Sequence, residues 1–200
     1  DSLACLQREH PDMDMLGIGL DFSARLALPP EAGAGPRTLF YPGSSIGNFT
    51  PDAALAFLRQ AHDAAAGGAL LIGVDLVKPV DVLEPAYDDP LGVTAAFNRN
   101  MLLHLNRLAG TDFDIADWRH VAFFNNVDSR IEMHLEALRA ATVRWHGGER
   151  SFAAGERMHT ENSYKWQVDD FAALLQQAGF SRLRHWTDES GWFAVFLGFA

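Results

Sequence analysis

The chain has 200 residues, 48% of them hydrophobic, and a formal net charge of −10. A chain of this size can bury a substantial core, and its negative surface repels a phosphate backbone, so nucleic acid is not an expected partner. The one cysteine, Cys5, rules out a disulfide within the chain and is typical of a reducing compartment such as the cytoplasm. No apolar run approaches the roughly 20 residues that span a bilayer, so no membrane association is expected.

The first 78 residues alternate between strand and helix patterns. The expected elements, in order, are a helix end over 1–10, strands over 15–22 and 38–41, a helix over 51–66 and a strand over 69–77. The helix over 51–66 opens on Thr50-Pro51-Asp52, which combines a capping hydroxyl, a proline at the first helical position and an acid in the first turn. Apolar strands joined by a helix predict a parallel sheet, and hence an α/β fold whose ligands bind beyond the carboxyl ends of the strands.

The pattern changes after residue 78. Residues 79–112 look helical, residues 118–161 look like strands and turns, and the last segments predict a helix over 166–178 and strands over 182–187 and 192–199. We interpret the chain as a sheet-forming part over 1–78, an α+β insertion over 79–163, and a closing helix and strand pair over 164–200.

A turn with two glycines follows the strand over 38–41. Gly43 and Gly47 let the backbone approach a ligand closely, and Asn48 follows at the edge where a ligand would lie. An amide offers both a donor and an acceptor, so it can bind the ammonium and the carboxylate of a zwitterion together. A turn asparagine with a purely structural role is the alternative.

Two further positions suggest binding of polar groups. Asp21 and Phe22 end the strand over 15–22, where an acid can accept a hydrogen bond from an exocyclic amine, although an aspartate there can also cap a turn. The Tyr87 hydroxyl can donate a hydrogen bond to a carboxylate.

The segment around Glu161 offers a second set of candidates. Glu161 and Ser163 share one face if the segment is extended, and a carboxylate with a hydroxyl can hold a polar ring such as imidazole. A solvated edge strand is the alternative. Met133 is an apolar wall in either interpretation.

Other site signatures are missing. The eight histidines form no HxH or HExxH pattern, so no metal site is predicted. The sequence also contains no serine-nucleophile elbow, Walker loop or nicotinamide-binding fingerprint, which argues against a dehydrogenase on the same type of sheet.

With these motifs, the chain resembles the histidine Nα-methyltransferases of ergothioneine biosynthesis, which depend on S-adenosylmethionine. The likeness runs over essentially the whole chain, and the blocks that carry it begin at Gly43 (GSSIGNF), Gly73 (GVDLVK), Ala86 (AYDDP), Gly92 (GVTAAFN), Arg130 (RIEM) and Thr160 (TENSYK).

The resemblance implies a Rossmann-like class I methyltransferase sheet with S-adenosylmethionine as cofactor. It implies that Asp21 and Phe22 hold the adenine of the cofactor, and that Gly43 lines the cofactor near its sulfonium. Residues 1–78 and 164–200 then belong to the methyltransferase domain, and residues 79–163 bind the substrate.

For the substrate, the resemblance implies L-histidine. Asn48 and Tyr87 match the groups that bind the amine and the carboxylate of the amino acid. Glu161 and Ser163 match the pair that binds the imidazole, and Met133 matches a residue that lines that pocket. The implied reaction is three successive methyl transfers to the α-amine, which give hercynine.

The chain departs from the family at its front. The first two sheet strands, with the Gly-rich turn that cradles the cofactor, have no counterpart here, so we expect a sheet that is incomplete at the N-terminus and has unpaired edges. Such edges suggest self-association or an N-terminal complement. Another acceptor such as tryptophan or a small dipeptide, and an inactive fragment or non-catalytic module, remain the alternatives.

Overall fold

The computed structural model describes residues 2–200, and its largest sheet among these residues has four strands. The order of the strands is β1 (Thr38–Tyr41), β2 (Ala69–Asp75), β9 (Phe193–Phe199) and β8 (Ser181–Thr187). Strands β1 and β2 pair in parallel, whereas β9 runs antiparallel to both of its neighbours. This mixed α/β sheet confirms the predicted strand–helix–strand unit.

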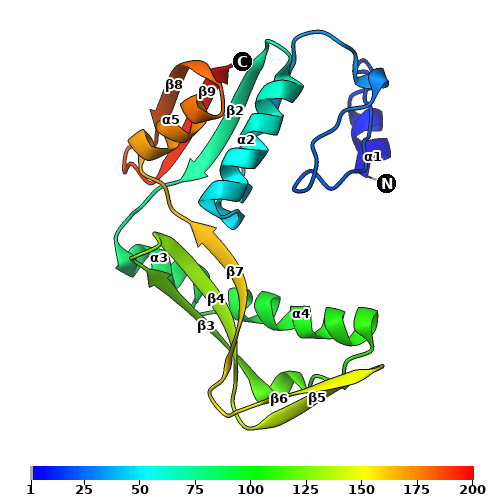
Figure 1. Ribbon diagram of the computed structural model, residues 1–200, viewed down its shortest axis with the longest axis vertical. Helices are drawn as coiled ribbons and strands as arrows, with labels where there is room; N and C mark the ends of the chain where they lie inside the picture. Colours follow the sequence, from blue (N-terminus) through cyan, green and yellow to red (C-terminus); the bar gives the residue numbers. More distant parts are fainter. Residues whose placement is uncertain (1) are drawn as a thin grey trace.

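Two helices cover one face of this sheet (Figure 1). They are α2 (Pro51–Ala65) and α5 (Val168–Gln177). The main core lies between these helices and the sheet, with Leu58, Ile72, Phe171 and Phe196 all completely buried. The predicted start of α2 is confirmed, because the Thr50 hydroxyl accepts a hydrogen bond from the Ala53 amide at 3.3 Å.

The middle of the chain forms a second layer, seen in the lower half of Figure 1. Its three-stranded antiparallel sheet has the order β3 (Trp118–Asn125), β4 (Arg130–Ala137) and β7 (Arg157–Tyr164). Its other elements are α3 (Val80–Tyr87), α4 (Val93–Ala109) and the hairpin of β5 (Ala141–Trp145) and β6 (Gly148–Phe152). Three 3₁₀ turns complete the described elements, namely η1 (Pro30–Ala32), η2 (Ser45–Asn48) and η3 (Ile115–Asp117).

The two layers meet where β2 and β7 end. Strand β7 runs from the lower sheet towards the upper one (Figure 1), and a bridge joins Leu76 to Trp166 just beyond the two strands. The backbone N–H of Trp166 also donates to the carbonyl oxygen of Asp75 at 3.1 Å. These links fix the end of β7 beside the carboxyl end of β2.

The strand predicted over 15–22 is wrong. This segment is irregular, and Leu16 and Ile18 are 54% and 38% exposed. An extended segment becomes a strand only when a neighbour takes up its hydrogen bonds. Within residues 2–200, β1 is an edge strand with no partner on its outer side, as the expectation of an incomplete sheet requires.

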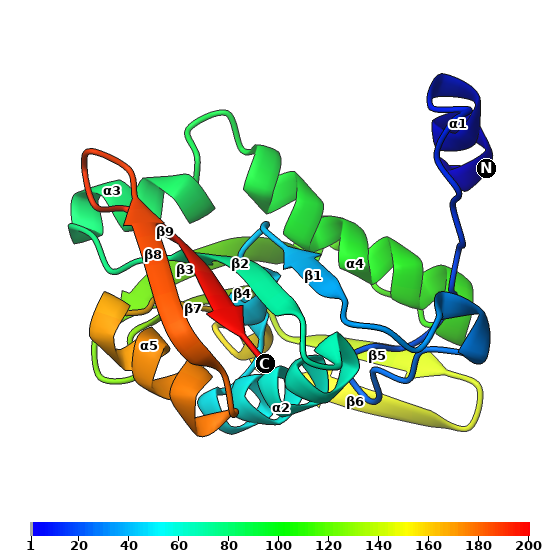
Figure 2. The same ribbon diagram turned by 90° about the horizontal axis from the view of Figure 1, so that it is seen from above.

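The first helix, α1 (Ser2–Glu9), stands apart from both sheets (Figures 1 and 2). None of its described residues is buried. In the part of the chain that the structure describes, no helix is both long enough and apolar enough to cross a membrane.

Candidate functional site

A cleft of about 350 Å³ opens where the carboxyl ends of β1 and β2 meet β7. The residues that the sequence places in a substrate or cofactor site and that line this cleft are Gly43, Asn48, Tyr87, Glu161 and Ser163. They come from the turn after β1, the end of α3 and the end of β7. The cleft therefore brings together three separate sequence motifs.

The turn after β1 is held against β7 by close backbone approaches. A Cβ atom on Gly47 would lie 3.0 Å from the carbonyl oxygen of Tyr164 and 3.6 Å from the Ser163 hydroxyl. A Cβ atom on Gly73 of β2 would overlap the carbonyl oxygen of Pro42. These two glycines let the turn reach the strand ends, which places the exposed Asn48 beside Ser163.

Other polar groups of the cleft were missed in the sequence. The Ser44 hydroxyl accepts a hydrogen bond from the Asp75 amide at 2.8 Å, and this bond ties the turn to the end of β2. Asp75, Ser44, Ser45 and Phe193 all line the cleft. Asp75 is the last residue of an apolar strand, so the same rule that singled out Asp21 could have found it.

A buried lysine lies beneath the hydroxyl groups of the cleft. The Tyr87 and Ser163 oxygens are 2.8 Å apart, and Lys165 Nζ lies 2.7 Å from each. Lys165 Nζ also lies 2.8 Å from Asp75 Oδ2, and its side chain is completely buried. The other carboxylate oxygen, Asp75 Oδ1, pairs with Lys78 Nζ at 2.6 Å.

Met133 is the direct partner of Glu161 across β4 and β7. It is 5% exposed and packs in a small cluster with Leu83 and Ile131, against which Tyr87 also lies. Met133 is not among the residues that line the cleft, so its contact with a substrate stays a prediction. Glu161 also lines a neighbouring cavity of about 360 Å³ along α4.

The structure does not bring Asp21 and Phe22 to the cleft. Asp21 Oδ1 accepts hydrogen bonds from the Ser23 hydroxyl at 2.5 Å and the Ala24 amide at 3.3 Å, which lower the pKa of Asp21. This is the turn cap that the sequence left open as an alternative. Phe22 packs against the rings of Tyr41 and Phe57 in an apolar pocket next to β1. Their role towards adenine stays a prediction.

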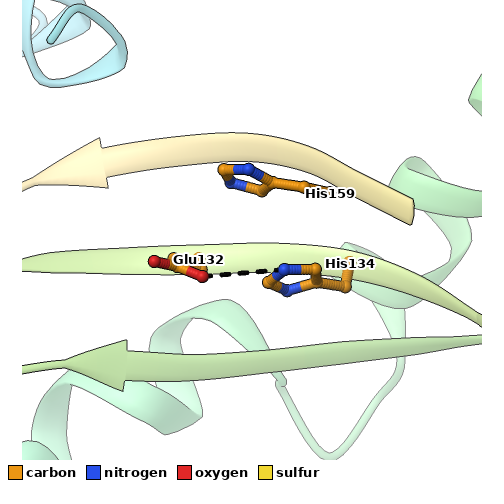
Figure 3. A group of neighbouring side chains, drawn as sticks. All are labelled: Glu132, His134 and His159. Atoms are coloured by element: carbon orange, nitrogen blue, oxygen red, sulfur yellow. Dashed lines mark ion pairs between the residues drawn. The ribbon is translucent and has the colours of Figure 1, made fainter. Parts of the chain in front are cut away.

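A cluster of possible metal ligands lies on β4 and β7, where Figure 3 shows Glu132, His134 and His159. One ligand atom from each lies within 4.8 Å of the others. The cluster could not be predicted from the sequence, because His159 joins Glu132 and His134 from a different strand. Burial first, and then the charge of His159, lower the pKa of His134, so its neutral form is favoured.

The arrangement favours a cluster held by ring stacking and hydrogen bonds over a cation site. The rings of His134 and His159 stack with centroids 4.8 Å apart and planes 23° from parallel. A bound cation lies in the plane of each imidazole that binds it, and two stacked rings disfavour this geometry. Glu132 also accepts hydrogen bonds from Asn125 and Arg130, and these bonds lower its pKa.

Comparison with known proteins decides the family. Residues 1–199 match the family described as histidine-specific, S-adenosylmethionine-dependent methyltransferases. The chain belongs to this family. The relatives of the chain include the histidine N-alpha-methyltransferase of Mycolicibacterium smegmatis, which is 41% identical over 97% of the chain and 61% of that protein. The enzyme of the same name from Mycobacterium tuberculosis is 42% identical over 96% of the chain and 60% of that protein.

A more distant relative is the ergothioneine biosynthesis protein 1 of Schizosaccharomyces pombe, with 32% identity over 53% of the chain and 14% of that protein. The chain thus spans about three fifths of the length of the two mycobacterial relatives.

The cofactor of the family fits the residues at one end of the cleft. A Cβ atom on Gly43 would meet only the Ser45 hydroxyl, at 4.0 Å, so open space lies beside this glycine inside the cleft. The role of Gly43 beside the sulfonium of S-adenosylmethionine stays a prediction.

Proposed function

We propose that the cleft binds L-histidine and that the protein transfers three methyl groups to its α-amine, giving hercynine for ergothioneine biosynthesis. The observation that carries this proposal is the shared cleft, where Asn48 and Tyr87 face the same space as Glu161 and Ser163. A zwitterion with a polar ring needs both sets of groups within the length of one amino acid.

The proposed task of the first set is alignment. S-adenosylmethionine, when bound, supplies a methyl group on a positively charged sulfur. The α-amine must be neutral and in line with that methyl carbon, and most of the rate then comes from holding this geometry. Asn48 is uncharged, so its carbonyl can hold an N–H of the amine while favouring the protonated form less than a carboxylate would. A trimethylated nitrogen has no N–H left, which favours release of the product.

The proposed task of the second set is recognition of the ring. The Glu161 carboxylate accepts a hydrogen bond from one ring N–H, and the Ser163 hydroxyl, which is hydrogen-bonded to Tyr87, donates to the other ring nitrogen. A substrate without a ring N–H leaves a half-buried carboxylate unpaired, which costs affinity.

We place this reaction in the cytoplasm, because a chain with one cysteine needs no oxidising compartment. We also propose that the outer edge of β1 pairs with a further strand, either of the same polypeptide or of a second copy. Sedimentation of the purified protein distinguishes these two sources by mass.

The proposal is tested by calorimetric titration of histidine and of S-adenosylmethionine, followed by mass spectrometry of the methylated products. Histidine should bind, and it should outcompete tryptophan and small dipeptides as acceptor. If tryptophan is methylated in preference to histidine, tryptophan is the substrate and the assignment to histidine is wrong. A folded protein that binds neither ligand would be a non-catalytic module, and the proposal would fail.

A further inference from the structure

The Lys165 ammonium has an acceptor for each of its N–H groups. A lysine ammonium offers three donors, and the three oxygens within 2.8 Å of Lys165 Nζ belong to Tyr87, Ser163 and Asp75. The side chain is completely buried, so water does not compete for these contacts. The lysine therefore fixes the positions of the two hydroxyl oxygens from below the cleft.

These contacts limit what the hydroxyl pair can do towards the cleft. Each oxygen accepts one hydrogen bond from Lys165, and one of the two hydroxyl hydrogens is used in the 2.8 Å contact between Tyr87 and Ser163. The oxygen that accepts this second bond has both lone pairs occupied, and its own hydrogen is free. The pair thus presents one hydroxyl donor to a ligand, on an oxygen with no acceptor capacity left, whereas the other oxygen keeps one lone pair.

The charges around the pair favour the same kind of ligand group. Lys165 is the cation in direct contact with both hydroxyls, so the charge nearest to them is positive. Glu161 lies in the same cleft and is negative. A neutral imidazole fits this polarity, with an N–H towards Glu161 and an unprotonated nitrogen towards the hydroxyl pair.

We propose that Lys165 is a positioning residue that fixes the Tyr87–Ser163 pair as a hydrogen-bond donor for an unprotonated acceptor atom of the substrate, the bare ring nitrogen of histidine. This inference rests on the proposed function of the cleft. Lys165 itself does not reach the ligand, because its three donors are already used.

Lys78 offers a matched control. Both lysines pair with Asp75, but only Lys165 also contacts the two hydroxyls. Lys165→Met should weaken histidine binding about 10- to 100-fold, because the hydroxyl pair loses its charged partner, while Lys78→Met should change it by less than about twofold. Affinity for S-adenosylmethionine should stay within about twofold in both variants, whereas general damage to the fold would lower both affinities.

Equal losses of histidine binding in the two variants would overturn the inference, because the common contact with Asp75 would then explain them. Histidinol, which lacks the carboxylate, identifies the acceptor. The loss caused by Lys165→Met should persist for histidinol if the acceptor is the ring nitrogen. Disappearance of the loss would mean that the hydroxyl pair binds the carboxylate, and would overturn the assignment to the ring.

A measurement on the unmodified protein covers the case in which Lys165→Met does not fold. In a nitrogen-15 NMR spectrum of lysine side chains, the ammonium of Lys165 should exchange its protons slowly, and its signal should shift when histidine is added. A rapidly exchanging signal, or a signal that histidine leaves unchanged, contradicts the inference. If the unmodified protein does not bind histidine at all, the proposed function fails, and a slowly exchanging signal would then identify Lys165 as structural only.

Discussion

Met133 and Glu161 face each other directly across the antiparallel strands β4 and β7. Directly opposed residues place their side chains on the same face of a sheet, so one face carries both a buried thioether and a cleft carboxylate. The register shift that follows Met133 lies next to this pair. Ligand binding by Glu161 and packing by Met133 can be tested separately, because Glu161 lines the cleft and Met133 packs in the cluster with Leu83 and Ile131.

Replacing Glu161 tests the ring pocket. Glu161→Ala should weaken histidine binding by about 1.5–3 kcal/mol, the usual worth of a hydrogen bond to a charged group, and should leave the affinity for S-adenosylmethionine unchanged. Calorimetric titration of both ligands measures this. Glu149→Ala on the exposed hairpin is the control and should alter neither affinity. Unchanged histidine affinity in Glu161→Ala would show that the pocket is assigned wrongly.

Replacing Met133 tests packing behind the pocket. Met133→Ala should lower the free energy of unfolding by about 2–5 kcal/mol, because it opens a cavity next to Leu83 and Ile131. Met133→Leu keeps the volume and should cost less than about 1.5 kcal/mol. Urea denaturation gives both values. If Met133→Ala is as stable as the parent protein, the Met133 side chain does not stabilise the sheet through this cluster.

The elements that could be predicted are those whose signals are local. The cap Thr50 and the glycines after α2 mark a helix without reference to the rest of the fold, and α2 was predicted to within a residue of its end. The strand over 15–22 failed because its partner is not a local property. Leu16 and Ile18 carry a strand pattern, but no strand among residues 2–200 takes up their hydrogen bonds.

The candidate site shows the same division. Asn48 could be predicted because it follows two glycines in a turn, and Glu161 because side chains alternate along a strand. The fold brings both residues to one cleft. Lys165 was missed, because lysine in a sequence normally indicates an exposed position. Its burial depends on Asp75 and Tyr87, which lie far away in the chain and supply the compensating oxygens.

Two glycines of the turn should respond differently to alanine. Gly43→Ala should leave the free energy of unfolding unchanged or raise it by up to about 1 kcal/mol, because the backbone is not left-handed there and the added methyl meets only open space. The same methyl enters the cleft and should lower the affinity for S-adenosylmethionine. Gly47→Ala should instead cost about 1–3 kcal/mol of stability, since its methyl would press on Tyr164.

Thermal and urea unfolding measure the stability of both variants, and titration with S-adenosylmethionine measures their affinity for the cofactor. A Gly43→Ala variant with full affinity for S-adenosylmethionine would remove this glycine from the cofactor site. A Gly47→Ala variant of full stability would mean that η2 can move away from β7 without cost.

The free energy of unfolding at acidic pH should depend on the Asp89 carboxylate, which caps the start of α4. Asp89 accepts hydrogen bonds from the Thr94 amide at 2.8 Å and the Val93 amide at 3.0 Å, and these lower its pKa from the ordinary 3.8 to about 2. Because the pKa falls on folding, the carboxylate stabilises the protein fully above the unfolded value and loses this contribution as the pH falls from about 4 to about 2. Asp89→Asn keeps the shape of the cap but not the charge. The difference in unfolding free energy between the parent protein and Asp89→Asn, measured by urea denaturation, should be constant above about pH 5 and shrink below pH 4. A difference that does not change with pH would mean that Asp89 caps the helix through its shape alone.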